Sequence, residues 1–207
     1  MTDTAGNNKV FRMLYQPGTA PVILTVPAFK FATIDGKGDP NGEEFGFATA
    51  ALYTFSYTVK MSYKSKDVPI DYYEYKVFPL EGEWDLEDKG KPITDKCNYK
   101  YKIMIRQPEF LSEALFERFL EAAKKKKPNP QLDKLRFEVI DEGLCCQMLH
   151  VGSYDSEPAS FLLMDKFCNE NKYRRISRTH REIYLSDPRR TEASRLKTIL
   201  RYKIQNL

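Results

Sequence analysis

The sequence predicts an α+β fold made of two strand-helix-strand-strand modules with pseudo-twofold symmetry, an antiparallel sheet with helices on one face, and a central ligand cleft. Its 207 residues, 42% hydrophobic and 30% charged, have the composition of a folded globular protein. A strand, a Gly/Asp-containing turn and an amphipathic helix follow one another at 31–52 and again at 146–167. Each module alone is too small to bury its own sheet, so the two are expected to pack as a pair.

The first half is expected to contain a strand, a helix and two further strands, at 22–34, about 43–63, 70–80 and 99–107. Pro27 marks a bulge or an edge in the first strand. The helix is indicated by apolar residues at helical spacing on one face, namely Phe45, Leu52, Phe55 and Val59. The two strands after it are expected to pair across the connection at 81–98.

The second half is expected to begin with a helix at about 112–126, with Ser112 as its N-cap. A strand, a helix and two strands follow at 135–151, from about 157, at 173–186 and at 197–205. Ser156 and Pro158 fit the start of the second helix. We therefore expect a flexible N-terminal segment (1–20) and a single domain (21–207), composed of module one (about 21–110), a linker helix (about 111–130) and module two (about 131–207).

Several classes of protein are disfavoured by what the sequence lacks. No apolar run approaches the roughly 20 residues of a membrane span, and the N-terminus does not resemble a secretory signal, so no membrane association and a cytoplasmic location are expected. The four cysteines have no C-x-x-C spacing and are expected to be reduced and mostly buried. With two histidines and no clustered ligands, no metal is expected, and the absence of phosphate-loop and dinucleotide motifs leaves no cofactor expected.

The charge is unevenly distributed along the chain. The net charge is +4, but residues 171–207 carry 11 Lys and Arg against 3 Asp and Glu. Such a basic region raises nucleic acid as a partner. Because these charges alternate with apolar residues, as on the outer faces of ordinary strands and a helix, a nucleic-acid partner is not expected. The oligomeric state is left open by the sequence.

The segment at 178–188 contains the strongest candidate for chemistry. In a strand, His180, Glu182 and Tyr184 share one face, while Ile183 and Leu185 take the other. One interpretation of Glu182 is an exposed strand residue paired with an arginine. The other is an anionic anchor in an aromatic pocket, where a carboxylate that is removed from water attracts cations strongly.

Aromatic residues are concentrated before and after residue 80. They include Tyr72, Tyr73, Tyr75, Phe78 and Trp84, followed by Tyr99 and Tyr101 on the next expected strand. Such a strand is either a core strand or one wall of a ligand site, and the pattern alone leaves both open.

Three runs of residues resemble motifs of the GyrI-like small-molecule-binding family: 78–84, 150–159 and 182–189. The resemblance extends from about residue 30 to 204, and the third run is its most specific part. It implies two strand-helix-strand-strand (SHS2) modules with a cleft that binds hydrophobic, often planar or cationic, aromatic compounds. It also implies that Glu182 is the buried glutamate that anchors the ligand.

Within that family the chain is most similar to stand-alone cyclopropanoid cyclopropyl hydrolases, which open the cyclopropane ring of DNA-alkylating compounds and so protect the cell. This resemblance implies catalytic roles for Glu182, which would position or deprotonate water, and for Tyr184. The ligand-binding residues would be Tyr73, Trp84, Tyr101, Tyr154 and His150. Where many relatives have Gly-Leu-Trp-Trp, this chain has Gly82-Glu83-Trp84-Asp85, so one aromatic is missing.

Three functions follow as hypotheses. The first is binding of planar hydrophobic or cationic xenobiotics, with hydrolysis of the electrophilic ones. The second is binding and sequestration without chemistry. The third is an interaction with DNA gyrase, which rests on the family name and the basic C-terminal region.

Overall fold

The computed structural model describes residues 9–92 and 94–207. These residues form two compact units that alternate along the chain: unit 1 comprises 29–80 and 86–140, and unit 2 comprises 9–28, 81–85 and 141–207. The fold is mixed α+β, and the strands of each unit pair antiparallel. Residues 22–28 and 81–85, which we placed in module one, belong to unit 2. The pseudo-twofold axis and the central cleft stay predictions.

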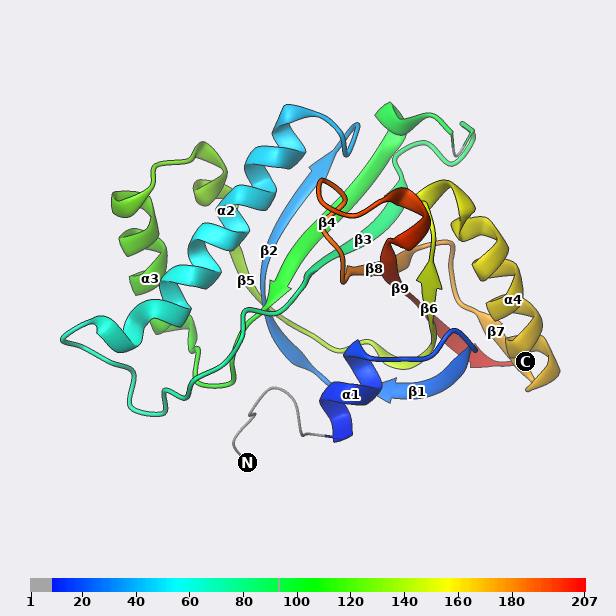
Figure 1. Cartoon of the computed structure of the whole chain (residues 1–207), viewed down its shortest axis with the longest axis horizontal. Helices are drawn as coiled ribbons and strands as arrows, with labels where there is room; N and C mark the ends of the chain where they lie inside the picture. Colours follow the sequence, from blue (N-terminus) through cyan, green and yellow to red (C-terminus); the bar gives the residue numbers. More distant parts are fainter. Residues whose placement is uncertain (1–8, 93) are drawn as a thin grey trace. The chain divides into compact units, whose positions relative to one another are not determined.

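Unit 1 is a three-stranded antiparallel arrangement covered by helices. Strand β2 (Phe29–Lys37) pairs with both β4 (Tyr99–Arg106) and β5 (Arg136–Ile140). Helix α2 (Glu43–Lys60) packs against β2 and β4, and α3 (Glu113–Lys126) packs against α2 (Figure 1). Three short 3-10 helices complete the unit: η1 (Met61–Lys64), η2 (Lys96–Asn98) and η3 (Pro130–Lys134).

The expected helix of the first half is confirmed as α2 and η1. Leu52, Phe55 and Val59 are fully buried, as their helical spacing predicted, whereas Phe45 near the start of α2 is only partly buried. The ring of Phe55 meets that of Phe116 in α3, with ring centroids 4.6 Å apart. Ser112 caps α3 as predicted, because its side chain accepts a hydrogen bond from the backbone N–H of Leu115.

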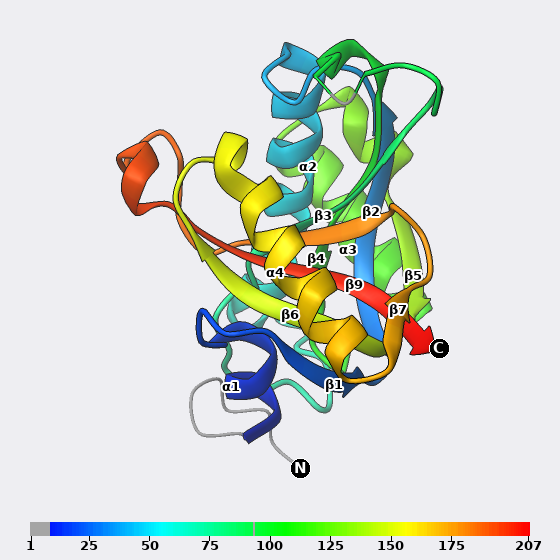
Figure 2. The ribbon, with the colours of Figure 1, turned by 90° about the vertical axis from the view of Figure 1, so that its right-hand side faces the viewer.

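Unit 2 has a longer antiparallel series of strands. Their order is β1 (Val22–Val26), β6 (Gly143–Val151), β9 (Lys197–Asn206), β8 (His180–Tyr184) and β3 (Leu80–Leu86), and β7 (Tyr173–Arg175) pairs with β9. Helix α4 (Glu157–Glu170) packs against β6 and β7 (Figure 2). The remaining elements are α1 (Lys9–Tyr15), η4 (Tyr154–Ser156) and η5 (Ala193–Arg195).

Helix α4 closes a hydrophobic cluster with the strands beneath it. Met164 and Cys168 of α4 are buried against residues of β6 and β9, which are Cys146, Met148, Leu200, Tyr202 and Ile204. Cys145 is buried as well, and only Cys97 is exposed, so the prediction of free and mostly buried thiols is confirmed. Among the described helices, none is both long and apolar enough to span a bilayer.

The prediction of a strand at 70–80 is wrong. Residues 71–79 have no regular secondary structure, and strand β3 begins only at Leu80. Pro79 has no N–H to give to a strand pairing. The aromatic side chains of the segment instead pack around one ring, because Tyr72, Tyr73 and Tyr75 all contact Phe110, with ring centroids 5.3, 5.5 and 6.1 Å from it.

Other boundaries also differ from expectation. The strand at 22–34 is interrupted after Val26, so that Pro27 and the residue after it separate β1 from β2. The strand at 173–186 is likewise divided into β7 and β8. Residues 9–15, which we included in a flexible segment, form helix α1, whose Leu14 and Tyr15 are buried. Ser156 precedes α4, but its hydroxyl donates to the carbonyl of Ser153 rather than capping the helix.

A buried ion network lies behind β8 in unit 2. The Arg181 guanidinium is 3.1 Å from a carboxylate oxygen of Glu81 and 3.1 Å from one of Glu142, and Glu142 is 2.7 Å from Arg201. The hydroxyl of Tyr15 donates to the other oxygen of Glu81 at 3.0 Å. All four charged residues are at least nine-tenths buried. The network ties together β3, β8, β9 and the turn before β6.

Candidate functional site

Strand β8 presents alternate side chains to two different surroundings. Arg181 and Ile183 are 2% and 0% exposed on one face. His180, Glu182 and Tyr184 are partly buried on the other and bond to one another. The predicted sharing of one face by these three residues is therefore confirmed.

The carboxylate of Glu182 is held by two hydrogen-bond donors. Its Oε2 accepts from the Tyr184 hydroxyl at 2.9 Å, and its Oε1 lies 3.1 Å from Nε2 of His180. A carboxylate oxygen can only accept, so Nε2 carries the hydrogen of the second bond. The side chain of Glu182 is 12% exposed. Glu182 is thus a largely buried acceptor on an aromatic surface, not an exposed glutamate paired with an arginine.

Trp84 extends this chain of hydrogen bonds from the neighbouring strand. Its indole Nε1 donates to the Tyr184 hydroxyl at 2.8 Å, and the hydroxyl in turn donates to Glu182. Trp84 is 7% exposed and stands opposite His180 in the β3–β8 pairing. The indole therefore fixes the direction of the Tyr184 hydroxyl toward the carboxylate.

Gly82 provides the space for this arrangement. It lies opposite Glu182 in the pairing of β3 with β8. A Cβ atom on Gly82 would be 2.7 Å from Trp84 Nε1 and 3.1 Å from the Tyr184 oxygen. Any larger residue would displace one of these two side chains.

Gly82→Ala is therefore expected to weaken ligand binding by about tenfold, because it disturbs one hydrogen bond to a charged group worth roughly 1.5–3 kcal/mol. Titration of a planar aromatic cation against both proteins, followed by Trp84 fluorescence, measures the effect. Gly46→Ala in the exposed part of α2, where a Cβ meets nothing within 4 Å, is the matched control. Equal affinities for Gly82→Ala and wild type would contradict this role of Gly82.

The turn after β6 brings two further residues to Glu182. Tyr154 of η4 packs edge-on against Tyr184, with ring centroids 6.1 Å apart. Glu157, the first residue of α4, is 6% exposed, and it lies close enough to Glu182 for the charge of that residue to raise its pKa. Phe161, one turn further along α4, packs edge-on against His180 at 4.8 Å. The site is thus built from β3, β8, η4 and α4.

The surroundings keep the neighbouring acidic groups protonated. Burial, with the charge and hydrogen bond of Glu182, raises the pKa of Glu157 to about 10. Burial and then the charge of Glu182 raise the pKa of Tyr154 to about 12. Burial, followed by the charge and hydrogen bond of Glu182, raises the pKa of Tyr184 well above its usual value. Both tyrosine hydroxyls therefore retain their protons at neutral pH.

His150, predicted to bind ligand, has bonds within the protein on both ring nitrogens. Nδ1 lies 2.9 Å from the Ser160 hydroxyl, and Nε2 lies 3.0 Å from the Ser153 carbonyl. Its side chain is buried, and Gly152 next to the ring has φ 145°, a conformation that suits glycine. His150 thus holds the turn that carries Tyr154 and Glu157; direct ligand contact stays a prediction.

Tyr73 and Tyr101, also predicted to bind ligand, belong to unit 1. The Tyr73 hydroxyl accepts from the backbone N–H of Glu109 at 3.3 Å. Tyr101 is 3% exposed, and its ring packs edge-on against Phe45 at 5.1 Å. A Cβ on Gly36 would overlap this ring, so the glycine makes room for it. Ligand binding by Tyr73 and Tyr101 stays a prediction.

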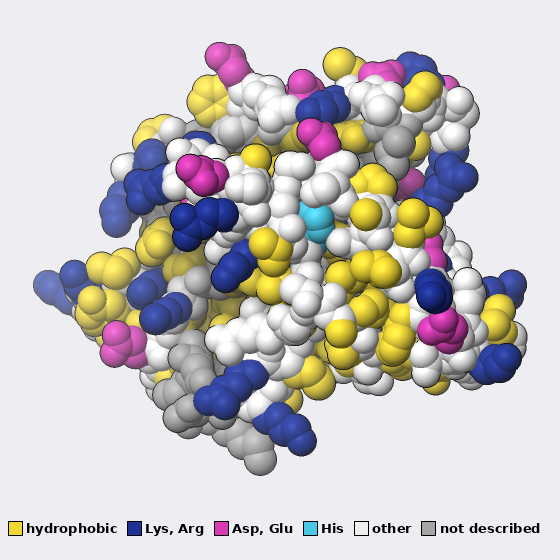
Figure 3. Space-filling view, turned by 45° about the vertical axis from the view of Figure 1, so that its right-hand side comes forward, with side chains coloured by type: hydrophobic (Ala, Val, Ile, Leu, Met, Phe, Trp, Pro, Cys, Tyr) yellow, Lys and Arg dark blue, Asp and Glu magenta, His cyan; other side chains and the backbone are white. Residues whose placement is uncertain are grey.

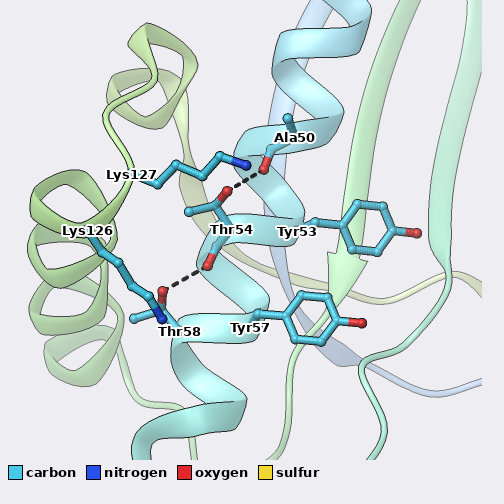
Figure 4. A pocket seen from close by; sticks show the side chains of 7 residues that line it. All are labelled: Ala50, Tyr53, Thr54, Tyr57, Thr58, Lys126 and Lys127. Carbon is cyan, nitrogen blue, oxygen red and sulfur yellow. Dashed lines mark hydrogen bonds between the residues drawn. The ribbon is translucent and has the colours of Figure 1, made fainter.

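Glu182 is not among the residues that line two surface hollows. One, of about 320 Å³, lies between α2 and the end of α3 and is lined by Ala50, Tyr53, Thr54, Tyr57, Thr58, Lys126 and Lys127 (Figure 4). The hydroxyls of Thr54 and Thr58 donate to carbonyls of their own helix, which reduces what they offer a ligand. The lining of this hollow contains no carboxylate.

The second hollow lies in the basic C-terminal region. It is lined by Val151, Arg190, Thr191, Glu192, Ser194, Arg195 and Lys197. On the face drawn in Figure 3, Lys and Arg side chains stand in separate groups, interrupted by acidic and apolar ones. Within the described residues no cluster of three or more His, Cys, Asp and Glu has an arrangement suited to a metal ion.

The sequence reasoning did not select Glu157 or Phe161 as site residues. Acidic side chains such as Glu157 are common in the first turn of a helix and do not by themselves indicate a site. Phe161 packs partly against the hydrophobic cluster of unit 2. The available signal was the spacing of the two by four residues, which places them on one face of α4.

Comparisons with known proteins agree with the fold. A family model described as the GyrI-like small molecule binding domain matches residues 19–203. A structure from Listeria innocua described as an uncharacterized conserved protein is 36% identical, with a TM-score of 0.88 over 94% of this chain and 96% of that one. A structure described as a hydrolase from the same organism is 34% identical, with a TM-score of 0.88 and the same shares of both chains.

A more distant structure supports the fold alone. The C-terminal domain of EcmrR is 11% identical, with a TM-score of 0.53 over 90% of this chain and 98% of that one. No curated protein matches the chain significantly.

Proposed function

The chain belongs to the family of GyrI-like small-molecule-binding domains, and from this we propose that it binds planar hydrophobic or cationic compounds beside Glu182 and hydrolyses the electrophilic ones. The proposed substrates are cyclopropane-containing DNA-alkylating compounds, whose opening would protect the cell. Two relatives at 34% identity that are described as hydrolases support the catalytic part.

The single observation that carries the proposal is the environment of the Glu182 carboxylate. A largely buried carboxylate accepts hydrogen bonds from Tyr184 and His180 and lies among aromatic side chains. Aromatic faces stack on flat ligands and attract cations. A carboxylate in such surroundings is an effective acceptor for a proton from one bound water molecule.

The proposed reaction adds water across one strained C–C bond. Glu182 takes a proton from the water as its oxygen bonds to the ring carbon. The C–C bond breaks, and its electron pair moves to the conjugated carbonyl oxygen of the substrate. Tyr154, whose hydroxyl is protonated at neutral pH, donates a hydrogen bond to that oxygen as charge develops on it. The proton held by Glu182 then passes through solvent to the same oxygen, which completes the addition of water and regenerates the carboxylate. Tyr184 fixes the carboxylate of Glu182 in direction.

Binding without chemistry is the second candidate, and the family description favours it because it specifies only small-molecule binding. The experiment that separates the two candidates is incubation of a cyclopropane-containing alkylator with a stoichiometric amount of the protein. Hydrolysis predicts a product whose mass is increased by one water, and multiple turnovers at lower protein concentration. Quantitative recovery of unchanged compound, together with saturable binding, would leave sequestration as the function.

A further inference from the structure

We propose that Glu157 is a positioning residue for Glu182: its carboxyl stays protonated in the folded protein and donates a hydrogen bond to the Glu182 carboxylate. The pair then carries one negative charge instead of two. This inference rests on the proposed function for the identity of the site, but not for the state of the two carboxyls.

Burial is the first argument for a protonated Glu157. The residue is 6% exposed, and its Oε1 has no hydrogen-bond partner among the described residues. An ionised carboxylate with an unpartnered buried oxygen is strongly disfavoured, whereas a protonated carboxyl tolerates the same place far better.

The second argument is the proximity of the two carboxyl groups. Tyr154, three residues before Glu157, packs against Tyr184, and Phe161, four residues after it, packs against His180, so Glu157 lies over the face of β8 that carries Glu182. Two buried carboxyls that meet cannot both be ionised, so one of them holds a proton. Glu182 accepts from Tyr184 and His180, and both bonds stabilise its ionised form. The proton is therefore assigned to Glu157. Its pKa is raised to about 10 by burial first, then by the charge and hydrogen bond of Glu182, and then by Asp155.

The groups that face the pair come from several elements. Strand β8 contributes His180 and Tyr184, η4 contributes Tyr154 and Asp155, and Asp187 in the loop after β8 acts on Tyr154. The N-terminus of α4 favours an ionised first-turn carboxyl, but its effect is smaller than that of burial beside a second carboxylate.

The proton on Glu157 affects which ligands the site favours. A pair with one negative charge suits a planar ligand that is neutral or carries one positive charge. The hydrogen bond from Glu157 also fixes the carboxylate from a third direction. The oxygen that meets the ligand is thereby held in place by α4 as well as by β8.

The first test measures protein stability and needs no substrate. In the unfolded chain Glu157 ionises near its ordinary pKa of 4.5, whereas in the folded protein it keeps its proton to about pH 10. The folded state therefore binds more protons in this window, and its stability falls as the pH rises. Glu157→Gln removes this effect. Its free energy of unfolding, relative to wild type, is expected to increase steadily with pH between about 4.5 and 10.

Glu170→Gln makes the same change at an exposed position of the same helix. The difference between its free energy of unfolding and that of wild type is expected not to grow with pH. Denaturant unfolding at a series of pH values measures both. If the difference in free energy of unfolding between Glu157→Gln and wild type did not change with pH, Glu157 would be ionised in the folded protein and the proposal would be wrong. If Glu157→Gln does not fold, the protonation state is measured in wild type from the ¹³C NMR shift of the Glu157 carboxyl carbon. The signal is assigned by its change in Glu182→Gln. The proposal requires the shift of a protonated carboxyl at pH 7.

The second test uses activity. Glu157→Leu is expected to lower kcat/KM by at least about tenfold, through loss of one hydrogen bond to a charged group. Glu157→Gln restores most of this loss, because an amide can donate the same bond without a proton to lose. Its activity also persists above pH 10, where that of wild type falls. Failure of Gln to do better than Leu would overturn the positioning role. Absence of turnover in every protein would count against the hydrolase proposal, while the stability series still decides the state of Glu157.

Discussion

Glu182→Gln is expected to lower the turnover of a cyclopropane-containing alkylator by at least about 100-fold, which is the lower range for removal of a general base. The amide keeps the size of the side chain and can still accept the Tyr184 hydrogen bond, but it cannot take a proton from water. Binding of an uncharged planar ligand is expected to change far less. Product formation by mass spectrometry and affinity by titration measure the two effects separately.

Glu192→Gln is the matched control, because Glu192 is an exposed residue of unit 2 that lines the second hollow rather than the site. It is expected to have the same turnover as wild type. Unchanged turnover in Glu182→Gln would show that Glu182 is not the general base. Equal losses in both variants would point to a general effect of removing one negative charge.

The largest expected loss of stability comes from the opposite face of the same strand. Arg181→Leu leaves Glu81 without its guanidinium partner in a buried place, and removes one of the two that Glu142 has. Breaking a buried ion pair by removal of one partner costs about 3–5 kcal/mol. Denaturant unfolding is expected to detect a loss of this size at pH 7. The loss should shrink in acid, because protonation removes the unpaired charge of Glu81.

Arg190→Leu is the comparison for that experiment. Arg190 is 87% exposed and lies 3.9 Å from Asp187, and such a surface pair is worth about 0–1 kcal/mol. Its loss of stability is expected to be small and to fall further at high salt. If Arg181→Leu were no more destabilising than Arg190→Leu, the buried network would not contribute to holding unit 2 together.

Sequence patterns located α2, α3 and α4 but missed α1. For α2 the signal was the helical repeat that burial imposes on apolar residues. Ser112 marked a helix start for a local reason that acts within a few residues. Pro27 was expected to mark a bulge or an edge, but the strand ends before it. The segment at 70–80 misled us, since its aromatic residues have high strand propensity, while its backbone is set by packing around Phe110 and by Pro79.

Only part of the candidate site could be predicted from the sequence. Alternation along β8 grouped Glu182 with its neighbours, because a strand fixes which side chains share a face. It did not identify Glu157, which reaches Glu182 from a different element 25 positions earlier in the chain. Such a contact depends on the docking of α4, which no local pattern encodes. The same holds for Arg181, whose partners Glu81 and Glu142 are distant in sequence.

The side chains of strand β8 alternate between a face that stabilises the fold and a face that forms the candidate site. One face anchors the strand through Arg181 and Ile183, and the other presents Glu182 and Tyr184. Residues that face a ligand can therefore be exchanged without loosening the scaffold, provided that the anchoring face is left intact. This division gives a site whose ligand preference can change while the protein continues to fold. A library that randomises Tyr154, which is 38% exposed, should accordingly yield mostly folded proteins with altered ligand preference.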